Sequence, residues 1–287
     1  MQLYRFDDVT KFCDRAEPFL QQDEVTHNLL LRLCKSFRLG NSRLQPSYLA
    51  IVADSAKVVA VAIRTPPHPV VLSLVEDVAA IELLVNDLHQ AEPLLPGINA
   101  PQVEATLFAE RWQRVTQRPS TLDMAMRIHQ LTAVQPVTKA RGELRLATVA
   151  DRDLIVSWQM AFRQEALGEM SERTDTESWA DQQLTAQSIY VWQDGDRPVA
   201  VACGYPASDR MGVINFVYTP PENRKQGYAT ACVAGVSQRL LEQGYSCCAL
   251  FTDQANPTSN KIYWTIGYRP VCDWYQYKFG QLETINP

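Results

Sequence analysis

The segment from Val213 to Thr230 combines residue types that could bind an anionic ligand. It begins with a β-branched and aromatic run, Val213–Tyr218, which predicts a strand that is buried on both faces. Pro220 and Pro221 end this strand because neither has an N–H to donate to a sheet. A helical pattern follows from Ala231 to Leu241. A tight strand-to-helix connection leaves the first helical N–H groups unpaired, and together with the helix dipole they attract anions.

Small residues lie where a phosphate would approach this segment. Gly227 lets an anion come close to the backbone, and Ala229 keeps the second close position small. We interpret the segment as a pyrophosphate cradle; the alternative is an ordinary turn that binds nothing. The spacing Arg-x-x-Gly-x-Ala, formed by Arg224, Gly227 and Ala229, resembles the acyl-CoA-binding motif of GNAT-superfamily N-acetyltransferases. Tyr228 departs from the usual small aliphatic residue, and we expect it to pack outward or to touch the nucleotide.

A second motif lies between Leu250 and Tyr268 and contains Asn256, Asn260 and Tyr263. It resembles the GNAT pattern at the end of the fifth strand and in the helix that follows. Asn260 and Tyr263 are three residues apart, so one helical face can present both to a shared cleft. The alternative is that Tyr263 is a packed aromatic residue and that the asparagines cap helices. The resemblance covers roughly residues 143–279 and identifies the second half of the chain as a GNAT-like domain.

The resemblance implies acyl transfer from acetyl-CoA to a primary amine by direct attack in a ternary complex, since holding two substrates in line supplies much of the acceleration. Tyr263 would be the general acid for the departing CoA thiolate. A backbone N–H near Tyr218 would stabilise the oxyanion, and the backbones of Val217 and Thr219 would pair with the pantetheine arm. The expected cofactor-binding residues are Val217, Tyr218, Thr219, Arg224, Lys225, Gln226, Gly227, Tyr228, Ala229, Thr230, Asn256, Asn260 and Tyr263.

The general base and the acceptor site rest on three carboxylates. Glu222, in the turn before the cradle, is the candidate base, and the alternative is a solvated turn residue. Glu165 on the first helix of the second half, and Glu169 in the loop after it, lie where GNAT acceptor sites collect side chains. They are the candidates for binding a cationic amine.

Composition limits the other possibilities. The chain has 287 residues and a formal net charge of −5, which argues against a general nucleic-acid binder. It has seven cysteines but no Cys-x-x-Cys spacing, and its four histidines are scattered, so we expect no metal site. No segment has the length and hydropathy of a signal peptide or a membrane span. We therefore expect a cytoplasmic protein with reduced thiols that is a monomer or a homodimer and binds a small-molecule or peptide amine.

The periodicity predicts two tandem α/β units with mixed sheets, residues 1–135 and 142–287, joined by a linker near residues 132–142. The first has a GNAT-like order of elements but no cradle after its strand at residues 70–74, so we expect it to be degenerate. Residues 93–99 read as a proline-rich turn, and residues 24–37 as one helix. In the second half we expect the order βααβββαβαβ, as the resemblance implies.

Two further functions remain open from the sequence. One is a non-catalytic acyl-CoA-binding or interaction protein that has kept the cradle. The other is an acyltransferase for a longer acyl group, which depends on the space near Tyr205, Trp192 and Phe216.

Overall fold

The computed structural model describes residues 1–40, 45–138, 140–168, 170 and 172–280, except for the side chain of residue 167. The chain forms two compact units, each described by itself below. The first unit contains Met1–Ile128, Thr252–Asn256 and the residues from Pro270 onward; the second contains His129–Phe251 and Pro257–Arg269. In the described residues, no helix is both long and apolar enough to cross a membrane.

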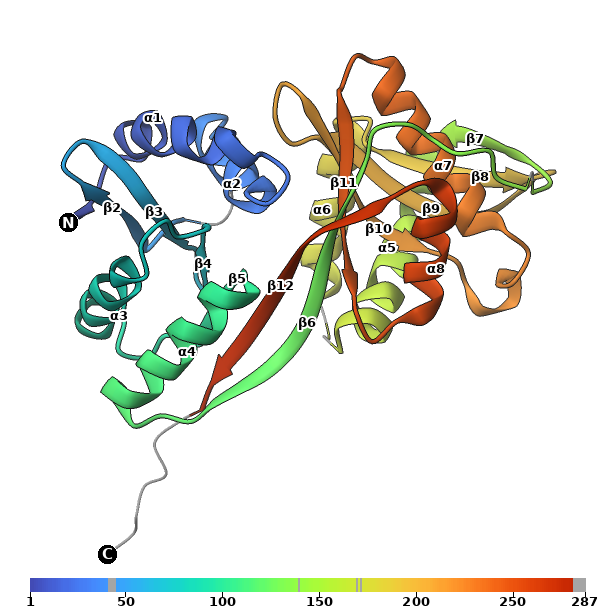
Figure 1. Ribbon diagram of the computed structural model, residues 1–287. Helices are drawn as coiled ribbons and strands as arrows, with labels where there is room; N and C mark the ends of the chain where they lie inside the picture. The colour runs from blue at the N-terminus through green and yellow to red at the C-terminus, as the bar shows by residue number, and fades with distance from the viewer. Residues whose placement is uncertain (41–44, 139, 169, 171, 281–287) are drawn as a thin grey trace, which may run out of the picture. The chain divides into compact units, whose positions relative to one another are not determined.

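The first unit is a sheet covered by helices on both faces (Figure 1). Its elements are β1 (Gln2–Arg5), α1 (Val9–Leu20), α2 (Asn28–Arg38), β2 (Tyr48–Asp54), β3 (Lys57–Arg64), β4 (Val70–Leu72), α3 (Ala79–Ala91), β5 (Gly97–Pro101), α4 (Gln102–Thr116) and β6 (Ser120–Leu131). The strand order is β1-β2-β3-β4-β5-β12-β6, in which β12 (Arg269–Phe279) comes from the end of the chain. Alternate residues of β2 and β3 join a core with α3, α4 and Phe279.

The second unit has the expected element order up to α8. It comprises β7 (Glu143–Leu146), α5 (Arg152–Phe162), a π-helical turn (Arg163–Leu167), α6 (Arg173–Thr185), β8 (Ile189–Asp194), β9 (Arg197–Pro206), β10 (Met211–Tyr218), a 3₁₀ turn (Pro221–Asn223), α7 (Tyr228–Glu242), β11 (Cys247–Asp253) and α8 (Pro257–Ile266). The strand order is β11-β10-β9-β8-β7. One core lies between the sheet and α7 with α8, and another between the sheet and α5 with α6.

Three expectations about the fold differ from the structure. The segment at residues 142–287 is not one unit, because β12 pairs antiparallel with β5 in the first unit, with Trp274 opposite Pro101 and Lys278 opposite Gly97. The turn at residues 93–99 contains the start of β5. Gly97 is in this strand because it pairs with Lys278 of β12, and it must be a glycine because a Cβ there would lie 2.0 Å from the Tyr277 carbonyl oxygen.

The third difference is the start of α2. The sequence pattern predicts a helix from residue 24, whereas α2 begins at Asn28. His27, immediately before it, is buried, and its Nδ1 lies 3.0 Å from the Leu20 carbonyl oxygen. The apolar periodicity continues through this turn, but the side chain of His27 is used to fix the chain between α1 and α2.

Candidate functional site

The strands β10 and β11 pair only at their first residues. The parallel ladder runs from Met211 opposite Cys247 to Val213 opposite Ala249, although β10 continues to Tyr218 and β11 to Asp253. The end of β10 therefore offers backbone donors and acceptors on the side of β11. An extended chain can bind such an edge as an added strand.

A β-bulge redirects the end of β10. Its register with β9 shifts between Asn215 and Tyr218, and Phe216 has a φ of 45°, which is unusual for an aromatic residue. The Phe216 ring is held edge-on by Trp179, with centroids 5.2 Å apart, and by Phe162 at 5.6 Å. Packing of the Phe216 ring against α5 and α6 thus stabilises the strained backbone conformation that bends β10.

The cradle adopts the geometry of an anion site. Gly227 has a φ of 84° and precedes α7, and the first intrahelical bond runs from the Ala231 N–H to the Gly227 carbonyl at 3.0 Å. No side chain caps this helix start, so the N–H groups of Tyr228, Ala229 and Thr230 have no partner within α7. A Cβ at Gly227 would meet nothing closer than the Ala140 Cβ at 3.8 Å.

Next to the cradle, Arg224 and Glu165 form an ion pair. An Arg224 guanidinium nitrogen lies 2.6 Å from a Glu165 carboxylate oxygen, and the Arg224 Nε donates to the Thr219 carbonyl at 2.8 Å. The Tyr218 hydroxyl donates to the other Glu165 oxygen at 3.0 Å. The hydrogen bond from Glu165 raises the pKa of Arg224, and burial followed by the contact with Glu165 raises the pKa of Tyr218. The structure thus joins a residue predicted to bind the cofactor to one predicted to bind the amine.

Tyr228 points away from the cradle. Its ring is buried in the core under α7, and its hydroxyl donates to Asp194 Oδ2 at 2.6 Å. This contact raises the pKa of Tyr228. The expectation that the Tyr228 side chain packs outward is wrong, because the ring lies in the core. Its contact with a nucleotide stays a prediction. Only its backbone N–H remains at the start of α7.

Tyr263 lies on α8 in the same core cluster as Tyr228 and Ala231. Its ring meets that of Tyr268 edge to face, with centroids 5.9 Å apart. Only 7% of the residue is exposed, and burial raises the pKa of its hydroxyl well above the ordinary value of 10.0. Within the described residues no hydrogen bond to this hydroxyl is found. A phenol in this state stays protonated at neutral pH and is available to donate.

The remaining predicted residues lie on the surrounding loops and turns. Glu222 is exposed in the 3₁₀ turn after β10, and Lys225, with a φ of 64°, and Gln226 are exposed next to it. Asn260 is half-buried on α8, and Asn256 directly precedes that helix. Glu169 lies outside the residues that the structure describes.

The structure also separates residues expected to line the acyl site. Trp192 packs in the core under α7, whereas Phe216 and Tyr205 pack with the core under α5. Asn215, which the sequence analysis missed, donates to the Tyr205 hydroxyl at 3.0 Å, at the bulge. A polar residue inside an apolar strand is a signal that could have drawn attention to this position.

The equivalent edge of the first unit is blocked by side chains. After β4, the Leu74 N–H donates to His27 Nε2 at 3.2 Å, and the Val75 N–H donates to Glu104 Oε1 at 3.2 Å. These amides follow the strand that corresponds to β10 in element order. No Arg-x-x-Gly-x-Gly/Ala spacing follows them in the sequence. Cradle and open strand edge thus coincide only in the second unit among the described residues.

Part of the second unit matches a known protein family. Residues 153–268 match the family model described as "Acetyltransferase (GNAT) family". A comparison with curated protein sequences finds no match. Several solved structures are similar in fold, at identities that carry no further inference about function.

Three of these structures cover most of the chain. An acetyltransferase of the GNAT family from Colwellia psychrerythraea is 10% identical with a TM-score of 0.63, over 97% of this chain and 100% of that one. A GCN5-related N-acetyltransferase from Sphaerobacter thermophilus is 14% identical with a TM-score of 0.61, over 85% and 84%. A tandem GNAT protein from the clavulanic acid biosynthesis pathway is 10% identical with a TM-score of 0.58, over 96% and 97%.

Proposed function

Because the chain has a tandem GNAT fold with a GNAT-family domain at residues 153–268, we propose that it transfers an acetyl group from acetyl-CoA to a primary amine. The observation that carries the proposal is the edge of β10, which parts from β11 after Val213, next to the uncapped start of α7. An extended pantetheine arm fits the first feature, and a pyrophosphate fits the second.

The cosubstrate is held mainly by backbone groups. The N–H groups from Lys225 to Thr230 receive the pyrophosphate, and the backbones of Val217 and Thr219 pair with the pantetheine arm. The N–H near Tyr218 faces the thioester oxygen, where it stabilises the negative charge that develops during attack. Asn256 and Asn260 bind the pantetheine arm from the side of α8. Arg224 adds a positive charge beside the cradle.

The reaction is a direct attack in a ternary complex. The neutral amine nitrogen forms a bond to the thioester carbonyl carbon, and the carbon–sulfur bond then breaks. The amine proton passes to Glu222 or to water, and the Tyr263 hydroxyl gives its proton to the departing thiolate. The Tyr263 hydroxyl is protonated at neutral pH, as an ordinary tyrosine is, and burial raises its pKa further. Solvent then returns a proton to Tyr263.

The acceptor is a small molecule or a peptide with a primary amine. Glu165 and Glu169 remain the carboxylates proposed to attract its cationic form. An amine that binds Glu165 has to compete with Arg224, which already lies 2.6 Å away. We also propose that the protein acts in the cytoplasm, since none of its seven cysteines forms a disulfide bond in the structure, and that it is a monomer or homodimer.

A screen of amines tests this function. The full chain is incubated with acetyl-CoA and a panel of polyamines, amino acids, aminoglycosides and peptides, and both the released thiol and the acetylated product are measured. We expect at least one amine to yield equal amounts of both. Tight CoA binding without thiol release for any amine would favour a non-catalytic acyl-CoA-binding protein. Release with longer acyl-CoA alone would favour an acyltransferase of different acyl specificity.

A further inference from the structure

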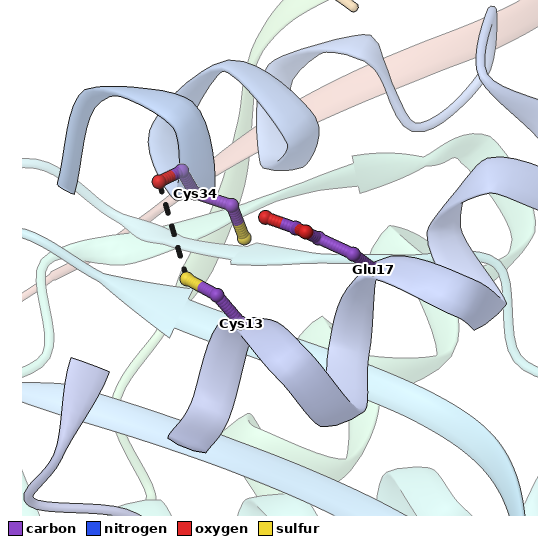
Figure 2. Close-up of side chains that lie close together, drawn as sticks. All are labelled: Cys13, Glu17 and Cys34. Carbon is purple, nitrogen blue, oxygen red and sulfur yellow. Dashed lines mark hydrogen bonds between the residues drawn. The ribbon is translucent and has the colours of Figure 1, made fainter. Parts of the chain in front are cut away.

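Three side chains of the first unit converge between α1 and α2. They are Cys13 and Glu17 on α1 and Cys34 on α2, and Figure 2 shows both sulfurs and the carboxylate pointing toward one another. Their ligand atoms, one from each residue, all lie within 4.8 Å of one another. This group has no part in the proposed transferase site, whose cradle and open strand edge belong to the second unit.

Helix geometry explains the cluster. Cys13 and Glu17 are four residues apart and so share one face of α1, while α2 packs against that face and presents Cys34. Both cysteines are fully buried, and the Glu17 side chain is 24% exposed, which opens one side of the cluster to solvent. The Cys13 thiol donates to the Cys34 carbonyl at 3.9 Å, a long and weak contact. The two sulfurs are therefore not held by strong hydrogen bonds.

A second layer of charged groups orients the carboxylate. Arg38 donates from Nε to one Glu17 oxygen at 2.9 Å and from a terminal nitrogen to the other at 3.1 Å; it also contacts Asp14 at 2.6 Å. Each carboxylate oxygen has a second lone pair, so Glu17 can still bind a cation. Two thiolates and Glu17 carry three negative charges, which a divalent cation and Arg38 would neutralise. Outer partners of this kind are typical of metal ligands.

We propose that Cys13, Glu17 and Cys34 bind one Zn²⁺ ion, with water as the fourth ligand. Thiolates favour zinc over magnesium or calcium, and a carboxylate with two sulfurs suits its tetrahedral geometry. Both thiols lose their protons to solvent as the ion binds, and no redox step is involved. The ion would join α1 to α2 and so stabilise the helical face of the unit that has no cradle.

Cobalt binding tests the site directly. The reduced, metal-free full chain is titrated with Co²⁺, whose thiolate charge-transfer absorption reports sulfur ligands, and Zn²⁺ is then added to displace it. We expect one Co²⁺ per chain. Cys13→Ser and Cys34→Ser should each abolish the thiolate absorption of the two-sulfur site. Glu17→Gln should weaken Zn²⁺ binding at least about tenfold, the lower end of the loss seen when even an outer partner of a metal ligand is removed.

Cys272 supplies the matched control, because it is a half-buried free thiol of the same unit outside the cluster. Cys272→Ser should bind Co²⁺ like the wild type. If the serine variants of the cluster do not fold, alkylation of the wild type decides, carried out in mild denaturant because both cluster thiols are fully buried in the folded chain. Zn²⁺ should then protect Cys13 and Cys34 but not Cys272.

Several results would overturn the proposal. One is the absence of thiolate absorption in the wild type, and another is its persistence in Cys13→Ser. Equal alkylation of the cysteines with and without Zn²⁺ would also do so. Recovery of a Cys13–Cys34 disulfide from the reduced preparation would assign the pair to redox chemistry instead.

Discussion

Replacing Tyr263 with phenylalanine separates chemistry from binding. The ring is buried and packs against Tyr268, with centroids 5.9 Å apart, and phenylalanine keeps this packing. The hydroxyl has no hydrogen-bond partner in the described part of the chain, so its loss leaves no buried group unpaired. We therefore expect the free energy of unfolding to change by less than about 0.5 kcal/mol.

The expected effect on turnover is much larger. A positioned general acid contributes about 10²- to 10⁴-fold, so kcat should fall by that factor. At 1.36 kcal/mol per tenfold change, this raises the activation free energy by about 2.7–5.4 kcal/mol. The dissociation constant of CoA should change less than about threefold, because the cradle lies on α7 and uses backbone N–H groups. Calorimetric CoA titration and thiol release with the best amine of the panel measure both quantities.

Tyr268→Phe is the control for this experiment. Tyr268 is also buried, and its hydroxyl lies 2.9 Å from the Ser237 hydroxyl. Its loss should cost about 0.5–1.5 kcal/mol of stability and leave kcat unchanged. If Tyr263→Phe turned over within threefold of the wild type, Tyr263 would not be the acid. The reasoning would also be refuted if both variants lost turnover equally.

Three further outcomes follow from the same structure. Gly227→Glu should weaken CoA binding more than about 100-fold through bulk and like charge. Gly227→Ala is the control, because it puts a side chain on the same left-handed backbone without adding a charge. Equal CoA binding by the two variants would contradict the cradle. Glu165→Gln removes a negative charge beside the cradle and should leave the CoA dissociation constant unchanged or lower. The loss of stability should be within about 1 kcal/mol. Tenfold weaker CoA binding would contradict this expectation and show that Glu165 positions Arg224 for phosphate. Burial lowers the pKa of His27 below its ordinary 6.5, so the unfolded chain takes up the proton first and the free energy of unfolding should fall as pH drops through about 6.5. Thermal melts of His27→Gln should show a flatter pH dependence of stability than the wild type. Equal slopes would show that His27 does not cause this pH dependence.

Short-range patterns in the sequence predicted the cradle segment and most helices and strands. The Asp8 carboxylate accepts from the Thr10 and Lys11 N–H groups as the N-cap of α1, a role that the sequence alone left open between Asp7 and Asp8. The strand β10 ends at Tyr218, as the residues predicted, whereas α7 begins at Tyr228, before the predicted start at Ala231. Such features depend on neighbours within one or two turns, so residue type and spacing specify them.

Contacts between residues far apart in the sequence decided the features that the sequence patterns did not predict. β12 pairs with β5 across more than a hundred and fifty residues, and the close approach of β12 explains why position 97 is a glycine. Helix packing likewise brings Cys13 to Cys34, although their spacing has no metal-binding signature. The pairing of Glu165 with Arg224 depends on where α5 ends over β10. The sequence alone predicted which segment would receive a phosphate. The tertiary structure decided which charged groups surround that segment, because those groups meet only after the sheet and its helices have packed.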